Sequence, residues 1–272
     1  MAISTVPRPA ERNSGPASEI RGWLKARREE SKAEYLKRPD PARILAETAA
    51  HVDEALARLW VQSIDEPRAA LVAVGGYGRG ALFPRSDVDI LVLLPDGQKP
   101  GASVERFIHS LWDLGLEPGH SVRTVAECID EAAKDVTVDT SLLEARLVTG
   151  DPTLMLELDA RLRARRDVRA FFEAKFREQK RRHDRFQDAA YNLEPNIKES
   201  PGGLRDLQMV IWLARAAGFG MGGIMPEYGP PDAPVSITDP AELPGSNLAE
   251  HERRAAVQRE ASRRFVRRER GA

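Results

Sequence analysis

Cysteine is almost absent from this 272-residue sequence, and so is any long apolar run. The single cysteine, Cys128, excludes an internal disulfide framework and a zinc site built on cysteines. No apolar stretch approaches the roughly 20 residues that a membrane-spanning helix needs. The formal net charge is only −1, so no overall charge attracts nucleic acid or a membrane surface. These absences indicate a cytoplasmic globular protein without a nucleic-acid or membrane partner.

The ends of the sequence differ in composition from its middle. Residues 1–19 lack an apolar signal core and are expected to form a disordered leader. After Gly218 the sequence is crowded with glycine and proline and then with arginine, so residues 220–272 are expected to be a linker and a solvated basic tail. Residues 20–219 are left as the folded part, long enough to bury a sizeable core.

Apolar periodicity predicts a mixture of helices and short strands between these ends. Asp40 followed by Pro41 suits a helix N-cap with proline at the first helical position, which divides the first helical region in two. The other expected elements are strands at 69–74, 88–94 and 116–124, helices at 104–114 and 207–217, a mostly helical stretch over 125–189, and a polar loop at 196–206.

The stretch GGYGRGALFPRSDVDILVLL, residues 75–94, carries the strongest chemical signal. It contains the pattern G-x-G-x-x-A after a strand, which is typical of dinucleotide binding. That motif needs a helix next, so that the helix N-terminus meets the pyrophosphate. Only seven residues separate Gly80 from the strand at Val88, and Pro84 is among them. The spacing therefore disfavours a dinucleotide site.

Asp87 and Asp89 favour a metal–phosphate site instead. Residues two apart in a strand point to the same face, so both carboxylates project together, and Asp89 lies inside an apolar run. Two adjacent carboxylates repel and are costly to desolvate, and Mg²⁺ relieves both problems. The glycines allow close approach of a triphosphate, with Arg79 and Arg85 as phosphate partners. A plain glycine turn before a strand is the structural alternative, and it leaves Asp89 unexplained.

A Gly-Gly turn followed by a spaced Asp-x-Asp resembles the signature of the DNA polymerase beta nucleotidyltransferase superfamily. Three later segments narrow the resemblance: GLEPGHSVRT (115–124), SLLEARLVTGD (141–151) and YNLEPNIKESPGGLRDLQMVIWLAR (191–215). Together with the glycine stretch they make residues 21–218 similar to the N-terminal half of the bacterial uridylyltransferase/uridylyl-removing enzyme. That family modifies the nitrogen regulatory protein P-II.

The resemblance implies an α+β fold: a polymerase-beta-like core with a small mixed sheet and flanking helices over 20–150, then a helical domain over 151–219. It implies magnesium-dependent transfer of UMP from UTP to a tyrosine of P-II, with release of pyrophosphate. It also implies that the chain is truncated, because the family continues into an HD-type hydrolase and two glutamine-sensing ACT domains. The alternatives are an impaired fragment that only binds nucleotide, or a nucleotidyltransferase with another donor or acceptor.

The resemblance also assigns roles to single residues. Asp87 and Asp89 are the expected metal ligands. Gly75 and Gly76, with Ser86 or Arg85 nearby, are expected to hold the triphosphate. For the third carboxylate of the superfamily, Glu117 is the choice, although Pro118 weakens a central strand. The alternatives are Asp139 and Glu144, the latter expected to pair with Arg146 or another arginine nearby.

Residues 198–206, KESPGGLRD, and two histidines complete the candidates. Arg205 is the better candidate for nucleotide contact and Lys198 the second, with a buried structural ion pair as the alternative. Asp206 suits the first turn of the helix that follows. His183, although part of an HD dipeptide, is expected to be solvated in an arginine-rich helix, and His120 is expected to be a core histidine more often than a site residue.

Overall fold

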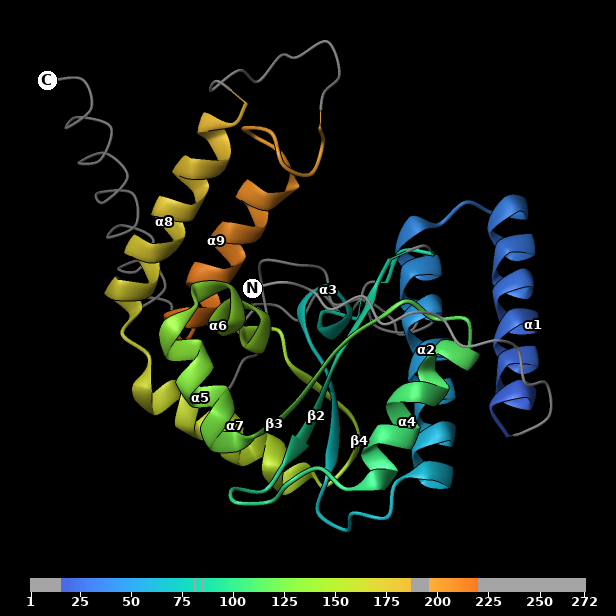
Figure 1. Ribbon diagram of the computed structural model, residues 1–272. Helices are drawn as coiled ribbons and strands as arrows, with labels where there is room; N and C mark the ends of the chain where they lie inside the picture. The colour runs from blue at the N-terminus through green and yellow to red at the C-terminus, as the bar shows by residue number, and fades with distance from the viewer. Residues whose placement is uncertain (1–15, 81, 85, 187–195, 220–272) are drawn as a thin grey trace, which may run out of the picture. The chain divides into compact units, whose positions relative to one another are not determined.

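A computed structural model describes residues 16–80, 82–84, 86–186 and 196–219 of the chain (Figure 1). The leader before residue 16 and the tail after residue 219 lie outside these ranges. The elements in chain order are α1 (Pro16–Lys37), α2 (Pro41–Ser63), β1 (Ala70–Ala73), α3 (Gly75–Gly78), β2 (Val88–Leu94), α4 (Ala102–Asp113), β3 (Pro118–Thr124), α5 (Val125–Lys134), α6 (Val136–Leu143), β4 (Arg146–Gly150), α7 (Pro152–Arg165), α8 (Val168–Asp184) and α9 (Leu204–Ala216).

The four strands form one mixed sheet in the order β3-β2-β1-β4. β1 pairs antiparallel with both β2 and β4, whereas β2 and β3 run parallel with Val88 opposite Pro118 and Asp89 opposite Gly119. Pro118 is therefore the first residue of an edge strand, a place where a missing N–H is tolerated. This position explains how a proline is accommodated in the strand that the sequence predicted.

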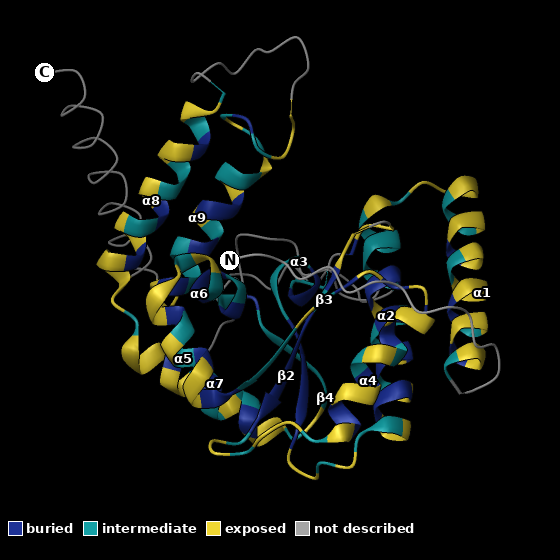
Figure 2. Ribbon diagram, in the orientation of Figure 1, coloured by how far each residue is buried: buried dark blue, intermediate teal, exposed yellow. Residues whose placement is uncertain are grey.

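The two faces of the sheet are buried under different helices (Figure 2). Val88, Ile90 and Val92 of β2 share one core with α1, α2 and α4, whereas Leu91 and Leu93 face the other core, to which α5 and α7 contribute. Burial of both faces explains why β2 is an almost continuous apolar run. Asp89 lies in the same alternating row as Leu91 and Leu93, at the beginning of that row.

A third, smaller core lies between α6, α8 and α9. Phe171, Met209, Trp212 and Ala216 are buried in it, and Val136 and Leu143 of α6 pack against it. The Lys175 ammonium, on a side chain that is 3% exposed, lies 4.4 Å from the centre of the Trp212 ring. This core attaches the α8–α9 pair to the same helix, α6, that reaches the end of β2.

The α+β class with a small mixed sheet and flanking helices is confirmed, and the predicted strands and the helices expected at 104–114 and 207–217 begin within three residues of the expected positions. Asp40 caps α2 by accepting a hydrogen bond from the Arg43 amide, and Pro41 is its first residue. Two differences stand out. α1 begins at Pro16, so residues 16–19, expected in the leader, are helical. β4 lies in the stretch that was predicted to be helical. None of the described helices is long and apolar enough to cross a membrane.

Candidate active site

Asp87 and Asp89 lie where β2 begins, as the sequence predicted. Asp87 is exposed and Asp89 is half-buried, and the Asp89 carbonyl accepts a hydrogen bond from the Val74 amide at 3.0 Å. Burial, followed by the charge of Asp87, raises the pKa of the Asp89 carboxyl, while Lys198 lowers it. The folded chain therefore holds two neighbouring carboxylates at a cost, in a place that one cation would stabilise.

The glycine turn meets Asp89 at Gly75. Gly75 has a φ of +56°, a left-handed conformation that favours glycine, and it begins the single turn α3 directly after β1. A Cβ atom built on Gly75 lies 3.4 Å from Asp89 Oδ2 and 3.5 Å from Ser141 Oγ. The side chains of Asp89 and Ser141 thus both lie close to the glycine turn at Gly75. Sequence reasoning did not single out Ser141, although it lies in the SLLEARLVTGD segment that was quoted.

Gly119 occupies the β3 position opposite Asp89. A Cβ atom on Gly119 would lie 2.3 Å from Asp89 Oδ1, so the Asp89 carboxylate uses the space that the missing side chain leaves. Glu117 is exposed and precedes β3, with its carbonyl bonded to the Val88 amide at 2.9 Å. Parallel register puts Glu117 beside Asp87 rather than Asp89. The described part of the chain has no cluster of three acidic, histidine or cysteine residues arranged to hold a metal ion.

The two alternatives for the third carboxylate are both engaged in ion pairs. Glu144 pairs with an arginine, as expected, but the partner is Arg79 at 2.5 Å and not Arg146, which pairs with Asp53 instead. Asp139 pairs with Arg166 at 2.6 Å, and both side chains are less than a tenth exposed. Both carboxylates are thus bound to arginines, and these contacts do not place either of them beside Asp87 and Asp89.

The expected phosphate partners have different placements. Arg79 follows α3 and its Nη2 lies 3.5 Å from a Cβ atom built on Gly76, so its guanidinium rests against the glycine turn. Ser86 is exposed one residue before Asp87, and its amide bonds to the Phe83 carbonyl at 3.0 Å. Arg85 lies outside the described residues. Gly75, Gly76, Arg79 and Asp89 are therefore the predicted residues that the structure brings together.

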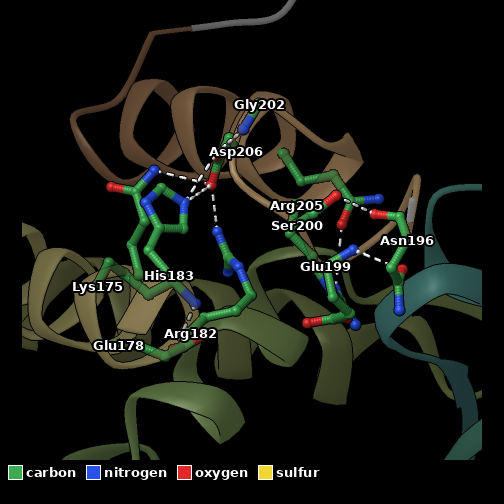
Figure 3. A network of polar contacts seen from close by, with 12 residues as sticks. Lys175, Glu178, Arg182, His183, Asn196, Glu199, Ser200, Gly202, Arg205 and Asp206 are labelled. Atoms are coloured by element: carbon green, nitrogen blue, oxygen red, sulfur yellow. Dashed lines mark hydrogen bonds and ion pairs between the residues drawn. The ribbon is translucent and has the colours of Figure 1, made fainter. Parts of the chain in front are cut away.

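Arg205 belongs to a different cluster, which folds the loop 196–203 before α9 (Figure 3). Its Nε lies 3.3 Å from Glu199 Oε1, its Nη1 donates to Gln208 Oε1 at 3.1 Å, and its guanidinium is 5.8 Å from the Trp212 ring centre. These contacts include an ion pair, but both of its side chains are 33% exposed, so it is not the buried pair that the sequence offered as the alternative. A nucleotide contact for Arg205 stays a prediction. Lys198 is the exposed basic residue of this loop whose charge reaches Asp89.

Asp206 is the centre of the same loop structure. Its carboxylate accepts hydrogen bonds from Gln179, Arg182 and the Gly202 amide and contacts His183 Nε2 at 3.0 Å (Figure 3). The prediction of a solvated His183 is therefore wrong, because that side chain contacts the Asp206 carboxylate of the neighbouring helix α9.

His120 is also placed differently from the prediction. It lies in β3 and is exposed, so the interpretation as a core histidine is wrong. β3 is an edge strand, and its middle residues are only partly covered, which explains why a polar side chain is accommodated there.

The donor atoms at the start of β2 fit a magnesium ion. Mg²⁺ binds oxygen ligands and commonly uses one or two carboxylates together with substrate phosphates. Asp87 and Asp89 supply those carboxylates, and no hydrogen bond joins the Asp89 carboxylate to another described residue. A bound cation would offset both the burial and the mutual repulsion that raise the pKa of Asp89.

Two family models match the chain. A model described as nucleotidyltransferase domain covers residues 54–143, which include the glycine turn, β2 and β3. A second, described as GlnD PII-uridylyltransferase, covers residues 170–272. The second match continues beyond Gly218, where the resemblance recognised from motifs ends.

Curated relatives named bifunctional uridylyltransferase/uridylyl-removing enzyme are similar over most of the chain. One from Burkholderia lata is 54% identical over 202 residues, which is 74% of this chain and 24% of the relative. One from Bordetella avium is 56% identical over 186 residues, 67% of this chain and 21% of the relative. One from Burkholderia vietnamiensis is 60% identical over 171 residues, 62% of this chain and 20% of the relative.

These relatives are much longer than the aligned region. The chain spans between a fifth and a quarter of the length of each relative named here. The aligned part nevertheless covers between 62% and 74% of this chain, and the fold agrees with the nucleotidyltransferase model, whose matched range includes β1, β2 and β3. The chain is thus a relative of the bifunctional uridylyltransferase/uridylyl-removing enzymes, and its described core has the fold of a nucleotidyltransferase domain.

Proposed function

We propose that this chain transfers UMP from UTP to a tyrosine hydroxyl of a P-II signal protein and releases pyrophosphate. The observation that carries the proposal is the Asp89 carboxylate beside the left-handed glycine turn at Gly75, with Asp87 near enough for its charge to raise the pKa of Asp89. The names of the relatives support a uridylyl group as the group transferred, and the description of the second family model names PII, whereas UTP as donor and a tyrosine as acceptor are part of the proposal. A reducing, cytoplasmic location suits an intracellular signal protein as acceptor.

In the proposed reaction the tyrosine oxygen forms a bond to the α-phosphorus of UTP, and the bond from that phosphorus to the bridging oxygen of pyrophosphate breaks. Magnesium, when bound, supplies charge neutralisation at the phosphates. Asp87 and Asp89 would hold it, and the main chain of Gly75 and Gly76 would lie against the triphosphate. The exposed Glu117, at the same end of the sheet, is the proposed acceptor of the tyrosine proton. Such transfers depend mainly on positioning and charge.

The direct test is transfer of radiolabelled UMP from UTP to purified P-II in the presence of Mg²⁺. We expect label on P-II that is lost when EDTA removes the metal and restored when Mg²⁺ is added back. Labelled ATP in place of UTP, and P-II with its acceptor tyrosine changed to phenylalanine, are the controls for donor and acceptor. A folded chain that binds UTP without labelling P-II would reduce the proposal to a nucleotide-binding module.

Gly119 gives a second test of the site. Replacement of Gly119 by alanine is expected to lower UMP transfer about a hundredfold, because the new methyl group would displace the Asp89 carboxylate, whose Oδ1 lies 2.3 Å from that position. The carboxylate is the end of a side chain and can rotate away, so the melting temperature should change little. Activity and circular dichroism melting would be measured together.

The matched control for this variant is Gly22→Ala in α1. A methyl group on Gly22 meets no atom within 4 Å, so the same substitution there should leave transfer unchanged. Wild-type activity in Gly119→Ala would contradict the placement of the Asp89 carboxylate and its proposed role.

A further inference from the structure

The segment from Glu144, which follows α6, to Arg146, the first residue of β4, contacts the glycine turn through two charged side chains. Arg146 donates two hydrogen bonds to the Asp53 carboxylate of α2, at 2.7 and 3.0 Å. Asp53 also accepts a hydrogen bond from the hydroxyl of Tyr77, the residue in the middle of α3. The Arg146 guanidinium lies 5.5 Å from the centre of the Tyr77 ring. This half of the contact fixes α3 to α2 and to the edge of the sheet.

Glu144 makes the other half of the contact. A Cβ atom on Gly78 would lie 2.0 Å from the Glu144 carbonyl oxygen, so the two backbones touch where Gly78 has no side chain. The Glu144 side chain is 2% exposed, and Oε2 pairs with Arg79 Nη1 at 2.5 Å. Oε1 is buried and has no hydrogen-bond partner among the described residues. Glu144 is therefore a buried carboxylate that has only one of its two oxygens paired.

A carboxylate in this state is poorly explained by stability alone. Burying a charge is costly unless it is fully hydrogen-bonded, and a buried ion pair is weak evidence for a stabilising role. What Glu144 does accomplish is geometric. It holds one arm of Arg79, while the other arm, Nη2, lies against Gly76 and has no acceptor among the described residues. The Arg79 side chain is 21% exposed, so this second arm can reach a ligand on the turn.

We propose that Glu144 is a positioning residue: it aligns Arg79 against the Gly75–Gly78 turn so that the second arm of the guanidinium binds the triphosphate of the nucleotide. The inference deepens the proposed function and rests on it. It assigns the phosphate contact to Arg79. It also gives a role to Glu144, which takes no part in the proposed reaction itself. A planar guanidinium with one arm fixed presents its remaining donors in a defined direction, which suits phosphate oxygens.

A double-mutant cycle on inorganic tripolyphosphate tests the inference without relying on catalysis. Affinity would be measured by calorimetry for the wild type, Arg79→Ala, Glu144→Gln and the double variant. We expect Arg79→Ala and Glu144→Gln each to weaken binding about tenfold, because either change removes one aligned, charge-assisted contact. The double variant should bind no more weakly than Arg79→Ala, because Glu144 acts through Arg79. Effects that simply add would overturn the inference.

Asp139→Asn is the matched control, because Asp139 also forms a buried ion pair, with Arg166. It should lower the melting temperature and leave tripolyphosphate affinity unchanged, whereas a general structural effect would move both quantities in both variants. If the chain transfers UMP but Glu144→Gln binds tripolyphosphate as tightly as the wild type does, the proposed function stands and this inference fails. A wild-type chain that neither transfers UMP nor binds tripolyphosphate removes both.

Discussion

Replacement of Asp89 by asparagine is expected to reduce UMP transfer by roughly a thousandfold or more and, at the same time, to stabilise the fold. Loss of a charged ligand from the proposed magnesium site would remove several kcal/mol of stabilisation from the reaction, and about 4 kcal/mol corresponds to a factor of a thousand. Asparagine keeps the shape of the side chain beside Gly119. Initial rates of label transfer and urea unfolding at several pH values would be measured on the same preparations.

The gain in stability follows from the direction of the pKa shift. Burial, and then the charge of Asp87, raises the pKa of Asp89 in the folded chain, so the folded state binds a proton more readily than the unfolded chain. The resulting loss of folding stability is complete above the folded pKa of Asp89. It vanishes at acidic pH, below the unfolded pKa of roughly 3.9. Asp89→Asn should therefore be more stable than the wild type at neutral pH without metal, and this difference should shrink as the pH falls.

Asp113 provides the comparison for Asp89. It is an exposed aspartate in the last turn of α4, and Asp113→Asn should leave both activity and stability close to those of the wild type. Retention of full activity in Asp89→Asn would remove the central assignment of the site. A loss of stability at neutral pH would show that the carboxylate is paired in the folded chain.

Replacement of Asp206 by alanine is expected to lower the free energy of unfolding by about 3–5 kcal/mol, the usual cost of leaving one partner of a buried ion pair without the other. The Arg182 side chain is 5% exposed, so its charge would stay buried beside an empty position. Gln179 and the Gly202 amide would lose their acceptor as well. Chemical denaturation would give the change in free energy.

Two observations check the mechanism of that loss. Asp184→Ala, an exposed position at the end of α8, should change stability by no more than about 0.5 kcal/mol. Burial raises the pKa of Asp206, but hydrogen bonds from Gln179, the Gly202 amide and His183 outweigh it, so the net pKa is lowered. The contribution of Asp206 is then present above its unfolded pKa and is lost as the pH falls through the folded one. A difference in the free energy of unfolding between wild type and Asp206→Ala that stays constant down to pH 2 would contradict this account.

The strands and helices that the sequence predicted correctly are those with strong local signals. Asp40-Pro41 marks a helix start by capping chemistry, and the apolar run 88–94 is long enough to be a buried strand. β4 was missed because its five residues follow a helix and its pairing partner, β1, lies far away in the sequence. An edge strand of this length is formed by tertiary contact rather than by its own pattern.

In the site, too, features set by local sequence could be predicted, whereas contacts between distant segments could not. The prediction that Asp89 stands at the start of a buried strand is confirmed, because the apolar run after it is a local signal, whereas the common projection of Asp87 and Asp89 stays a prediction. Which arginine meets which carboxylate depends on packing between distant segments. Arg79 with Glu144, and His183 with Asp206, are separated by 65 and 23 residues respectively, so spacing in the sequence carries no information about them.

The alternation in β2 also bears on how the chain avoids mispairing. Val88 and Ile90 to Leu94 are apolar on both faces of the sheet, so hydrophobicity alone does not distinguish the native pairing from one shifted by a single residue. Such a slip would move Asp89 into the core beneath α2 and α4, where an unpaired carboxylate costs several kcal/mol. The charge that destabilises the native sheet thus penalises the shifted sheet far more. Asp89, the proposed metal ligand, therefore also favours the native pairing register of β2.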